Sequence, residues 1–280
     1  MEFLVSEIHD DYVKYYSNRF ASTFSIAFIE KHQMAIMLLS YASLCYWGFS
    51  LAKQNAKPIV QEGKWILRVY NIFQVIFSGY IAYLAASTYL LTLVKTGDMC
   101  QRMDLDTEKD DKWYIDRQTY TCYLFYISKL VDIFDTIFII IRGKWRQLTF
   151  LHVFHHTSVI FLGWMAIYYH PCGFYHISIQ LNAPMHFFMY FYYFLSSFPE
   201  LAPHLWWKKY ITTLQLIQFI VGSAMAVFCF VKRLLVGEST GLSLIYTFSV
   251  IFYGITLLFL FTGFYNSAYK KKDEKKEKSK

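Results

Sequence analysis

The chain has 280 residues, of which 56% are hydrophobic and 21% aromatic, and its formal net charge is +7. This composition excludes an ordinary soluble domain, because soluble domains are less apolar and carry more charged residues. The positive charge does not indicate nucleic-acid binding, since the basic residues gather in short segments between long uncharged ones. The sequence therefore predicts an integral membrane protein.

Seven apolar segments long enough to cross a bilayer as helices follow one another along the chain. One crossing needs about 20 apolar residues, and residues 147–199 alone form a run of 53 without Lys, Arg, Asp or Glu. The predicted helices are 33–53, 66–94, 118–141, 148–169, 174–198, 208–231 and 241–268. We expect one all-α membrane domain over 33–269, preceded by a non-cytosolic segment over 1–32 and followed by a basic tail over 270–280.

The distribution of Lys and Arg predicts which side of the membrane each loop faces. The segments after the first, third and fifth predicted helices are basic, as is the C-terminal tail, whereas the N-terminus and the loop 98–116 are acidic. The positive-inside rule then places the C-terminus in the cytosol and the N-terminus on the other side. Lys232 and Arg233 are an exception to this pattern. Lys276 and Lys278 have the spacing of a dilysine signal for retrieval to the endoplasmic reticulum, or are an ordinary basic flank.

The five cysteines do not have the spacing of metal ligands. Cys45, Cys122 and Cys229 fall within predicted helices and are interpreted as packing residues. Cys100 and Cys172 both fall on the predicted non-cytosolic side, where an oxidising compartment allows disulfides. The sequence leaves open whether these two approach closely enough to form one.

The third predicted helix holds the two acidic residues that lie inside a span, Asp132 and Asp135. An ionisable group within a membrane is costly and indicates a functional site by default. Lys129, Asp132 and Asp135 are spaced by three and so share one face of the helix. They predict either part of a functional site or a structural ion pair that only holds helices together.

Histidines dominate the next two predicted helices. At 100° per residue, His152, His155 and His156 fall within an arc of about 100° on one helix. A single one would more often be a hydrogen-bonded core residue, but three on one face of an apolar helix favour a functional cluster. Asn182 and His186 are four residues apart on the following helix and also share a face.

The remaining polar candidates lie at a similar depth. At 1.5 Å per residue, the carboxylates, the histidines and two glutamines all lie roughly 9–20 Å from the basic side. Tyr190, Gln215 and Gln218 belong to this set, although each alone is more often a packing contact. The basic residues expected to ring the cytosolic mouth are Arg142, Lys144, Arg146, Lys208 and Lys209. This arrangement predicts a substrate with an anionic head at the surface and an apolar tail inside.

Four blocks of the sequence, in this order, resemble the ELO family of very-long-chain fatty acid elongases. They are residues 129–136, 150–156, 182–193 and 213–219. The family usually has Glu where this chain has Asp132. The resemblance implies a seven-helix protein of the endoplasmic reticulum in which six helices enclose a narrow acyl tunnel. It also implies a 3-oxoacyl-CoA synthase, which condenses acyl-CoA with malonyl-CoA and releases CO₂ and CoA.

Such a condensation needs a group that holds the acyl chain and a means of stabilising the enolate formed on loss of CO₂. No cysteine accompanies the polar cluster, and imidazole is both a good nucleophile and a base near neutral pH. We therefore predict that His155 attacks the acyl thioester and forms an acyl-imidazole, with His186 opposite as second base or nucleophile. His152 and His156 would orient these groups, and Asp135 would fix a tautomer.

The other candidates are expected to bind the substrates. Asn182, Gln215 and Tyr190 would donate hydrogen bonds to an oxyanion. Lys129, Asp132 and Gln218 are expected beside the substrate, and the basic mouth would bind the phosphates of CoA. No resident cofactor or metal is expected. Besides lipid, acyl-CoA and malonyl-CoA, the expected partners are other enzymes of the elongation cycle, and a homodimer is left open.

Two alternatives from other classes remain. A di-iron desaturase or hydroxylase also has His-x-x-His-His boxes, but usually several, whereas His170, His176 and His204 lie near predicted helix ends or loops. A seven-helix transporter or receptor could use the polar cluster as a relay, although the repeats with glycine-broken helices that are common in transporters are not evident. Metal analysis would distinguish the first alternative, and acyl-CoA-dependent release of CO₂ from malonyl-CoA the second.

Overall fold

The computed structural model describes residues 31–60, 64–97, 100, 112–169, 175–236 and 241–270, and its regular structure within these ranges is helical throughout. The all-α prediction is thus confirmed. The longer helices are α2 (Lys31–Lys53), α3 (Lys64–Thr96), α4 (Lys112–Val131), α5 (Ile133–Ile141), α6 (Phe150–Tyr169), α7 (Tyr175–Ser196), α8 (Lys208–Val236) and α9 (Gly241–Tyr265). The short ones are the 3₁₀ turns η1 (Trp145–Gln147) and η2 (Ala202–His204) and the π-helical turn η3 (Asn266–Lys270).

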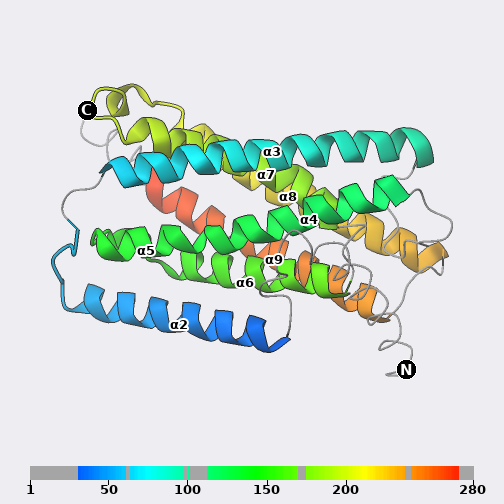
Figure 1. Cartoon of the computed structure of the whole chain (residues 1–280), viewed down its shortest axis with the longest axis horizontal. Coiled ribbons are helices and arrows are strands. Elements are labelled where there is room, and N and C mark those ends of the chain that lie inside the picture. Colours follow the sequence, from blue (N-terminus) through cyan, green and yellow to red (C-terminus); the bar gives the residue numbers. More distant parts are fainter. Residues whose placement is uncertain are drawn as a thin grey trace.

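The helices lie side by side along the long axis and alternate in direction, with α5 continuing α4 (Figure 1). The connections after α2, α5 and α7 and the end of α9 all lie at one end of the bundle, on the left in Figure 1. We call it the basic end, because Lys53, Arg142, Lys144 and Lys208 lie there. The opposite end, where α3 and α8 end, is called the disulfide end for the bond described below.

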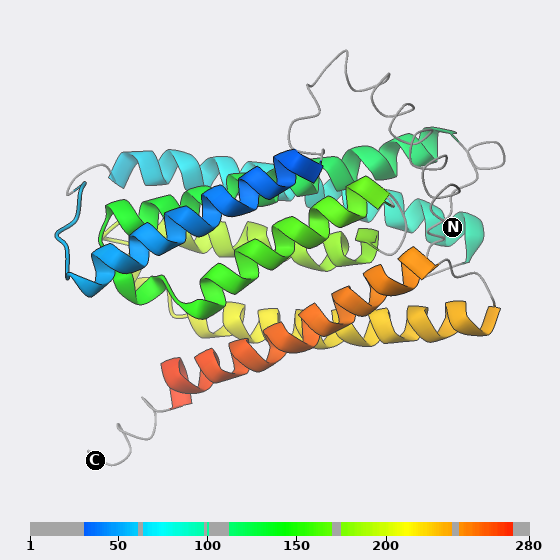
Figure 2. The same ribbon diagram turned by 90° about the horizontal axis from the view of Figure 1, so that it is seen from below.

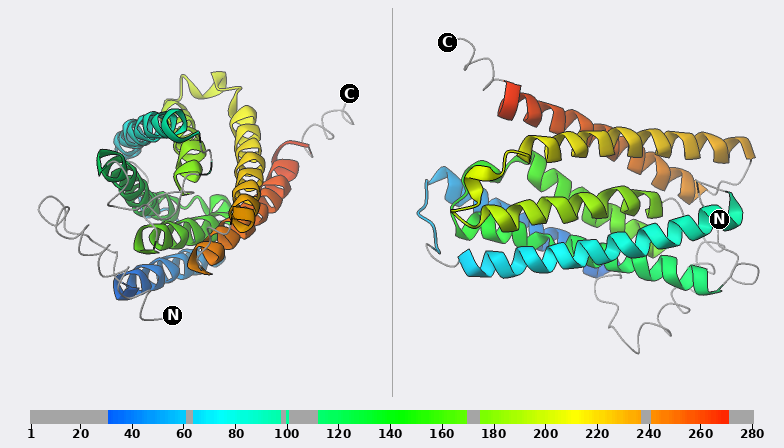
Figure 3. Two further views of the ribbon diagram at one scale, coloured as in Figure 1. Left: turned by 90° about the vertical axis from the view of Figure 1, so that its right-hand side faces the viewer. Right: turned by 90° about the horizontal axis from the view of Figure 1, so that it is seen from above.

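Six of the helices follow one another as neighbours around the bundle. α3 packs against α4 and α7, α4 against α6, α6 against α9, α9 against α8, and α8 against α7. α2 lies outside this succession, against α5 and α6, as the view along the long axis shows (Figure 3). α8 and α9 lie together along one side of the bundle (Figure 2).

Among the described residues, five helices are long and apolar enough to cross a membrane, in α2, α3, α6, α8 and α9. Their outer faces expose large apolar side chains such as Tyr46, Ile76, Phe228 and Phe259, as expected for surfaces that contact lipid. The protein is therefore a multi-pass membrane protein. The predicted third and fifth spans do not reach this threshold, because α4 carries several charged residues and α7 is interrupted by His, Asn and Gln.

The predicted third span is divided into α4 and α5 at Asp132. The interruption is slight, since the Asp132 amide still donates to the Ser128 carbonyl at 2.9 Å, while the Asp135 amide turns back to the Asp132 carbonyl at 3.1 Å. Gly143 then ends the helix with φ +61°, a left-handed conformation that glycine adopts without strain. A Cβ at this position would also press against Pro58. The turn returns the chain into α6 directly beside α5.

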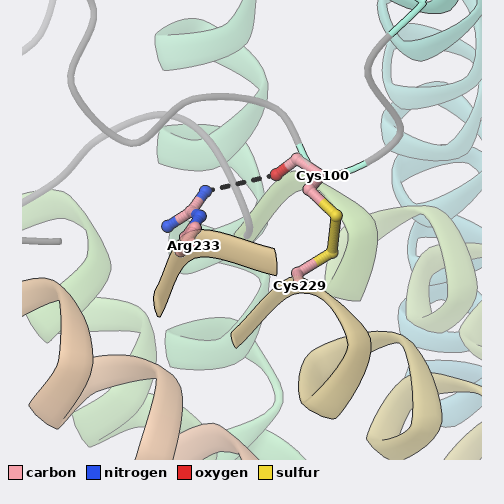
Figure 4. The surroundings of a disulfide bond; sticks show 3 residues. All are labelled: Cys100, Cys229 and Arg233. Carbon is pink, nitrogen blue, oxygen red and sulfur yellow. Dashed lines mark hydrogen bonds between the residues drawn. A yellow bond between two sulfur atoms is a disulfide. The ribbon is translucent and has the colours of Figure 1, made fainter. Parts of the chain in front are cut away.

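A disulfide joins Cys100, after α3, to Cys229 on α8, and Arg233 donates to the Cys100 carbonyl at 3.2 Å (Figure 4). The interpretation of Cys229 as a packing residue is therefore wrong, and Cys100 does not pair with Cys172, which lies outside the described residues. The hydrogen bond from Arg233 to the Cys100 carbonyl also explains why this arginine departs from the positive-inside pattern. Cys45 and Cys122 are buried, as predicted. Most of 1–32, most of the loop 98–116 and the whole tail after 270 also lie outside the described residues.

Replacing Cys229 with serine is expected to lower the thermal unfolding midpoint by about 5 °C, because the bond closes a long loop and restricts the unfolded chain. Thermal unfolding of the purified protein in detergent measures this shift. Cys100→Ser should cause the same loss, and the double variant no further loss. Additive losses from the two substitutions would contradict the shared bond.

Candidate active site

A network of buried polar side chains joins α3, α4, α5 and α7 near Asp132. Lys129 Nζ lies 3.1 Å from Asp132 Oδ2, and Gln74 donates to Asp132 Oδ1 at 2.6 Å. The Tyr190 hydroxyl lies 2.9 Å from the same oxygen and 2.6 Å from Asp135 Oδ2. Lys129 and Asp132 are only 1% and 2% exposed. Buried charges of this kind are tolerated only when they are paired and hydrogen-bonded, which is the case here.

His186 on α7 lies against this ion pair. Lys129 Nζ is 3.1 Å from His186 Nε2 and 3.4 Å from His186 Nδ1. Asp132 Oδ2 is 3.6 Å from His186 Nδ1. Although aspartate is shorter than the glutamate usual in the family, it reaches Lys129. An ammonium and a carboxylate therefore both border the imidazole of His186.

The histidines of α6 form a second group beside the first. His152 Nε2 lies 2.8 Å from Thr136 Oγ1 on α5, and that hydroxyl is 3.1 Å from Tyr41 on α2. The ring centroids of His152 and His156 are 4.4 Å apart, and those of His155 and His156 5.4 Å apart. The single face predicted for the three histidines thus forms one contiguous patch of imidazoles inside the bundle.

His155 makes a different contact from its neighbours. Its Nδ1 lies 2.9 Å from the hydroxyl of Tyr253 on α9. His155 is half-buried on α6, whereas His186 lies on α7 beside Lys129 and Asp132. The two histidines predicted to face one another therefore lie on different helices of the bundle and contact different groups.

A cavity of about 90 Å³ adjoins the histidines on the side of the disulfide end. We call it the apolar cavity, because residues such as Val159, Leu162 and Phe219 form much of its wall. Its wall also includes Asn182 and Tyr253. α4, α6, α7, α8 and α9 all contribute to it. Tyr253, which contacts His155, therefore connects the wall of this cavity to the histidines of α6.

The remaining predicted site residues fall into three groups. Asn182 and Gln218 line the apolar cavity, and Asn182 Oδ1 is buried without a hydrogen-bond partner among the described residues. Gln215 instead contacts the sulfur of Met189 at 3.9 Å. The third group is formed by the basic residues, which lie at the basic end of the bundle. They are Arg142, Lys144, Arg146, Lys208 and Lys209.

Asp135 does not make the contact predicted for it. Among the described residues, its carboxylate accepts a hydrogen bond from Tyr190, whereas the carboxylate beside a site histidine is that of Asp132. Both residues share one face of the α4–α5 segment, and the position of α7 brings His186 closer to Asp132. The role of fixing a histidine by a carboxylate therefore fits Asp132 better than Asp135.

Four residues of the site are absent from the sequence-based set: Tyr41, Gln74, Thr136 and Tyr253. Thr136 is four residues after Asp132 and could have been found from that spacing. Gln74 is a polar amide within an apolar segment, the same signal that indicated Gln215 and Gln218. Tyr41 and Tyr253 carry no such signal, because the chain has 24 tyrosines and their spacing does not distinguish these two.

Within the described part of the chain, no three His, Cys, Asp or Glu side chains converge as ligands around a metal ion would. His176 is buried near the start of α7, and His204 lies exposed in η2. His170 falls outside the described residues. The geometry thus adds no further histidines to the box on α6 and His186, and gives no support to the di-iron alternative.

The fold and site together define an all-helical multi-pass membrane protein with a buried cluster of imidazoles, carboxylates and amides beside an apolar cavity. Residues 28–277 match the model of the GNS1/SUR4 (ELO) family. The chain therefore belongs to the ELO family.

Several named relatives are very long chain fatty acid elongases. Elongase F of Drosophila simulans is 42% identical over 170 residues, which are 59% of this chain and 62% of the fly protein. This alignment thus spans less than two thirds of the fly protein. Elongase 2 of Mus musculus is 37% identical over 244 residues, with 86% of this chain and 77% of that protein covered. Elongase 5 of Tachysurus fulvidraco is 34% identical, with 82% and 73% covered.

Proposed function

We propose that this chain is a very-long-chain fatty acid elongase, which condenses acyl-CoA with malonyl-CoA to 3-oxoacyl-CoA and releases CO₂ and CoA. Membership of the ELO family and the names of its relatives support this activity. The observation that carries it in this chain is the contact of His155 with Tyr253, which lines the apolar cavity, together with the buried group of Lys129, Asp132 and His186. Acyl chains would occupy the cavity, and the thioester carbon would lie at the histidines.

In the first step, His155 Nε2 attacks the thioester carbon of acyl-CoA. A bond forms between nitrogen and carbon, the carbon–sulfur bond breaks, and CoA leaves with the electron pair. Imidazole suits this step because it is a strong nucleophile when neutral. Asn182 lines the cavity near this position, and its side-chain NH₂ would donate a hydrogen bond to the oxyanion.

In the second step, malonyl-CoA loses CO₂ and the resulting enolate carbon attacks the acyl-imidazole. The ammonium of Lys129 beside His186 would stabilise the negative charge of the enolate, because electrostatic stabilisation is strong in a water-excluded site. Asp132 would hold both groups in place. The roles proposed for His152 and His156 remain orienting ones, through the contact with Thr136 and through ring packing.

The same proposal accounts for the two ends of the bundle. The basic end would face the cytosol and bind the phosphates of CoA through Arg142, Lys144, Arg146, Lys208 and Lys209. The disulfide end would face the lumen of the endoplasmic reticulum. The bond between Cys100 and Cys229 supports this, because disulfides form in an oxidising compartment. Retrieval would use the dilysine-type tail over 270–280, and the N-terminal segment 1–32 would be lumenal.

We further propose that α4 with α5 and α7 cross the membrane together with the five more apolar helices, giving seven spans over 33–269. Six of them would form a barrel around a narrow acyl tunnel, which the closed succession of neighbouring helices supports. The substrates are acyl-CoA and malonyl-CoA, without a resident cofactor. Other enzymes of the elongation cycle are the proposed partners.

The test is an assay of the purified protein with malonyl-CoA labelled in its free carboxyl group and a panel of saturated and unsaturated acyl-CoAs. Release of labelled CO₂ should depend on acyl-CoA and rise at least tenfold over the rate without it. A 3-oxoacyl-CoA two carbons longer should appear in equal amount. Acyl-CoA-independent release, or bound iron required for turnover, would instead favour one of the two alternative classes.

A further inference from the structure

Tyr253 is the residue through which α9 reaches the histidines. Its hydroxyl lies 2.9 Å from His155 Nδ1, and the two rings are nearly parallel, with 15° between their planes. Phe154 packs beside Tyr253 with ring centroids 6.3 Å apart. Because Tyr253 also lines the apolar cavity, it stands between the proposed acyl chain and the proposed nucleophile.

His155 lacks the carboxylate partner that the histidine of a hydrolytic triad has. Among the described residues, its hydrogen-bond partner is Tyr253. Asp135 is engaged by Tyr190, and Asp132 by Lys129. The role of orienting His155, which was predicted for a carboxylate, can therefore be filled by the hydroxyl of Tyr253. Tyr253 lies on α9, a helix without any site residue in the sequence-based set.

The geometry points to Tyr253 as the positioning residue of His155. It holds the imidazole in the tautomer that carries its proton on Nδ1, with the phenol oxygen as acceptor. Nε2, on the opposite edge of the ring, then keeps its lone pair for the acyl thioester. This inference deepens the proposed function and rests on it for the identity of the reaction.

A hydroxyl suits both halves of the reaction because it can donate as well as accept. During attack, Nε2 bonds to the thioester carbon and the ring becomes positively charged, and the Tyr253 oxygen stabilises the Nδ1–H. The Tyr253 hydroxyl takes the Nδ1 proton and passes its own proton through water to the departing CoA thiolate, which yields CoA thiol and a neutral acyl-imidazole. Nδ1 now has a lone pair, and the Tyr253 hydroxyl donates to it.

In the second half, the enolate carbon forms a bond to the acyl carbon and the bond to Nε2 breaks. The electron pair returns to the imidazole, where the hydrogen bond from Tyr253 to Nδ1 stabilises the developing negative charge. One proton taken up from water at the basic end restores the Nδ1–H tautomer. A neutral hydroxyl also avoids the cost of another buried carboxylate inside the membrane.

Tyr253→Phe removes the hydroxyl and keeps the ring. We expect kcat to fall by about 10- to 100-fold, with KM for acyl-CoA within twofold and the unfolding midpoint within about 2 °C. The matched control is Tyr168→Phe, on the helix that carries His155. Tyr168 is buried against Trp164, is not part of the cavity wall, and lies roughly 20 Å along α6 from His155. This control should keep kcat within twofold.

Two readouts separate positioning from a structural role. The first is the rate of CoA release in a single turnover without malonyl-CoA, which Tyr253→Phe should slow to the same degree as kcat. The second is ¹⁵N NMR of labelled histidines, with His155 assigned as the signal lost in His155→Gln. The intact protein should show a protonated Nδ1, and Tyr253→Phe should shift His155 toward the Nε2–H tautomer.

The inference is overturned if Tyr253→Phe releases CoA at the rate of the intact protein, or if Tyr168→Phe loses as much activity. An unchanged tautomer of His155 in Tyr253→Phe overturns it as well. The NMR readout needs no turnover. A protein that releases no CO₂ from malonyl-CoA but shows the tautomer shift would refute the elongase proposal and leave the positioning of His155 intact.

Discussion

Replacing His155 with alanine is expected to reduce condensation on the order of 1,000-fold, because the variant loses the nucleophile that forms the acyl-enzyme. Its neighbours contact other groups instead of Tyr253 at the cavity wall, since His152 lies against Thr136 and His156 packs against Tyr41. Formation of labelled 3-oxoacyl-CoA under saturating substrates measures the loss. Mass spectrometry of the intact protein after incubation with acyl-CoA alone should show an added acyl group only when His155 is present.

His32→Ala is the matched control for this experiment. His32 lies exposed at the start of α2, so its removal should leave both condensation and the acyl adduct unchanged. Full activity in His155→Ala would refute the acyl-imidazole on this residue. Transfer of the adduct to a peptide containing His186 would assign the nucleophile to the second histidine instead.

Replacing Asp132 with asparagine is expected to destabilise the protein by about 3–5 kcal/mol, because it leaves the ammonium of Lys129 buried without its counter-charge. Condensation should be lost as well, since Lys129 and His186 would no longer be held together. Thermal unfolding in detergent and the CO₂-release assay measure the two effects on the same preparation.

Two further variants serve as controls for the Asp132→Asn prediction. Glu200→Gln makes the same change from carboxylate to amide at an exposed position and should alter neither property. Asp132→Glu restores the residue usual in the family and keeps the charge, so we expect stability within about 1 kcal/mol and activity within about fivefold. A stable, active Asp132→Asn variant would show that the ion pair is dispensable.

The sequence singled out the buried polar residues because such groups are expensive in a membrane and therefore few. Spacing by three or four placed Lys129 with Asp132, and Asn182 with His186, on shared faces. The fixed rise of a helix set their common depth. These arguments need only local geometry, and the structure places Lys129, Asp132 and His186 in direct contact.

Contacts between helices were predicted less well, for a physical reason. Asp132 and Asp135 occupy one face, and only the rotation of α7 decides that His186 meets Asp132 while Tyr190 contacts both carboxylates. Cys100 and Cys229 are separated by 129 residues, and nothing in the spacing of five cysteines selects that pair. Gln215 has the same chemical type as Gln218, but it contacts Met189 instead of the cavity.

The amino-acid sequence by itself determined the class of this protein, its apolar segments and the imidazoles and carboxylates that face inward, because hydrophobicity and helical periodicity are properties of neighbouring residues. The tertiary structure alone decided the partner of each group. Tyr253 shows this most clearly: one of 24 tyrosines, it reaches His155 only because α9 packs against α6. Partner choice depends on how helices distant in sequence are rotated against one another, and no local pattern records that rotation.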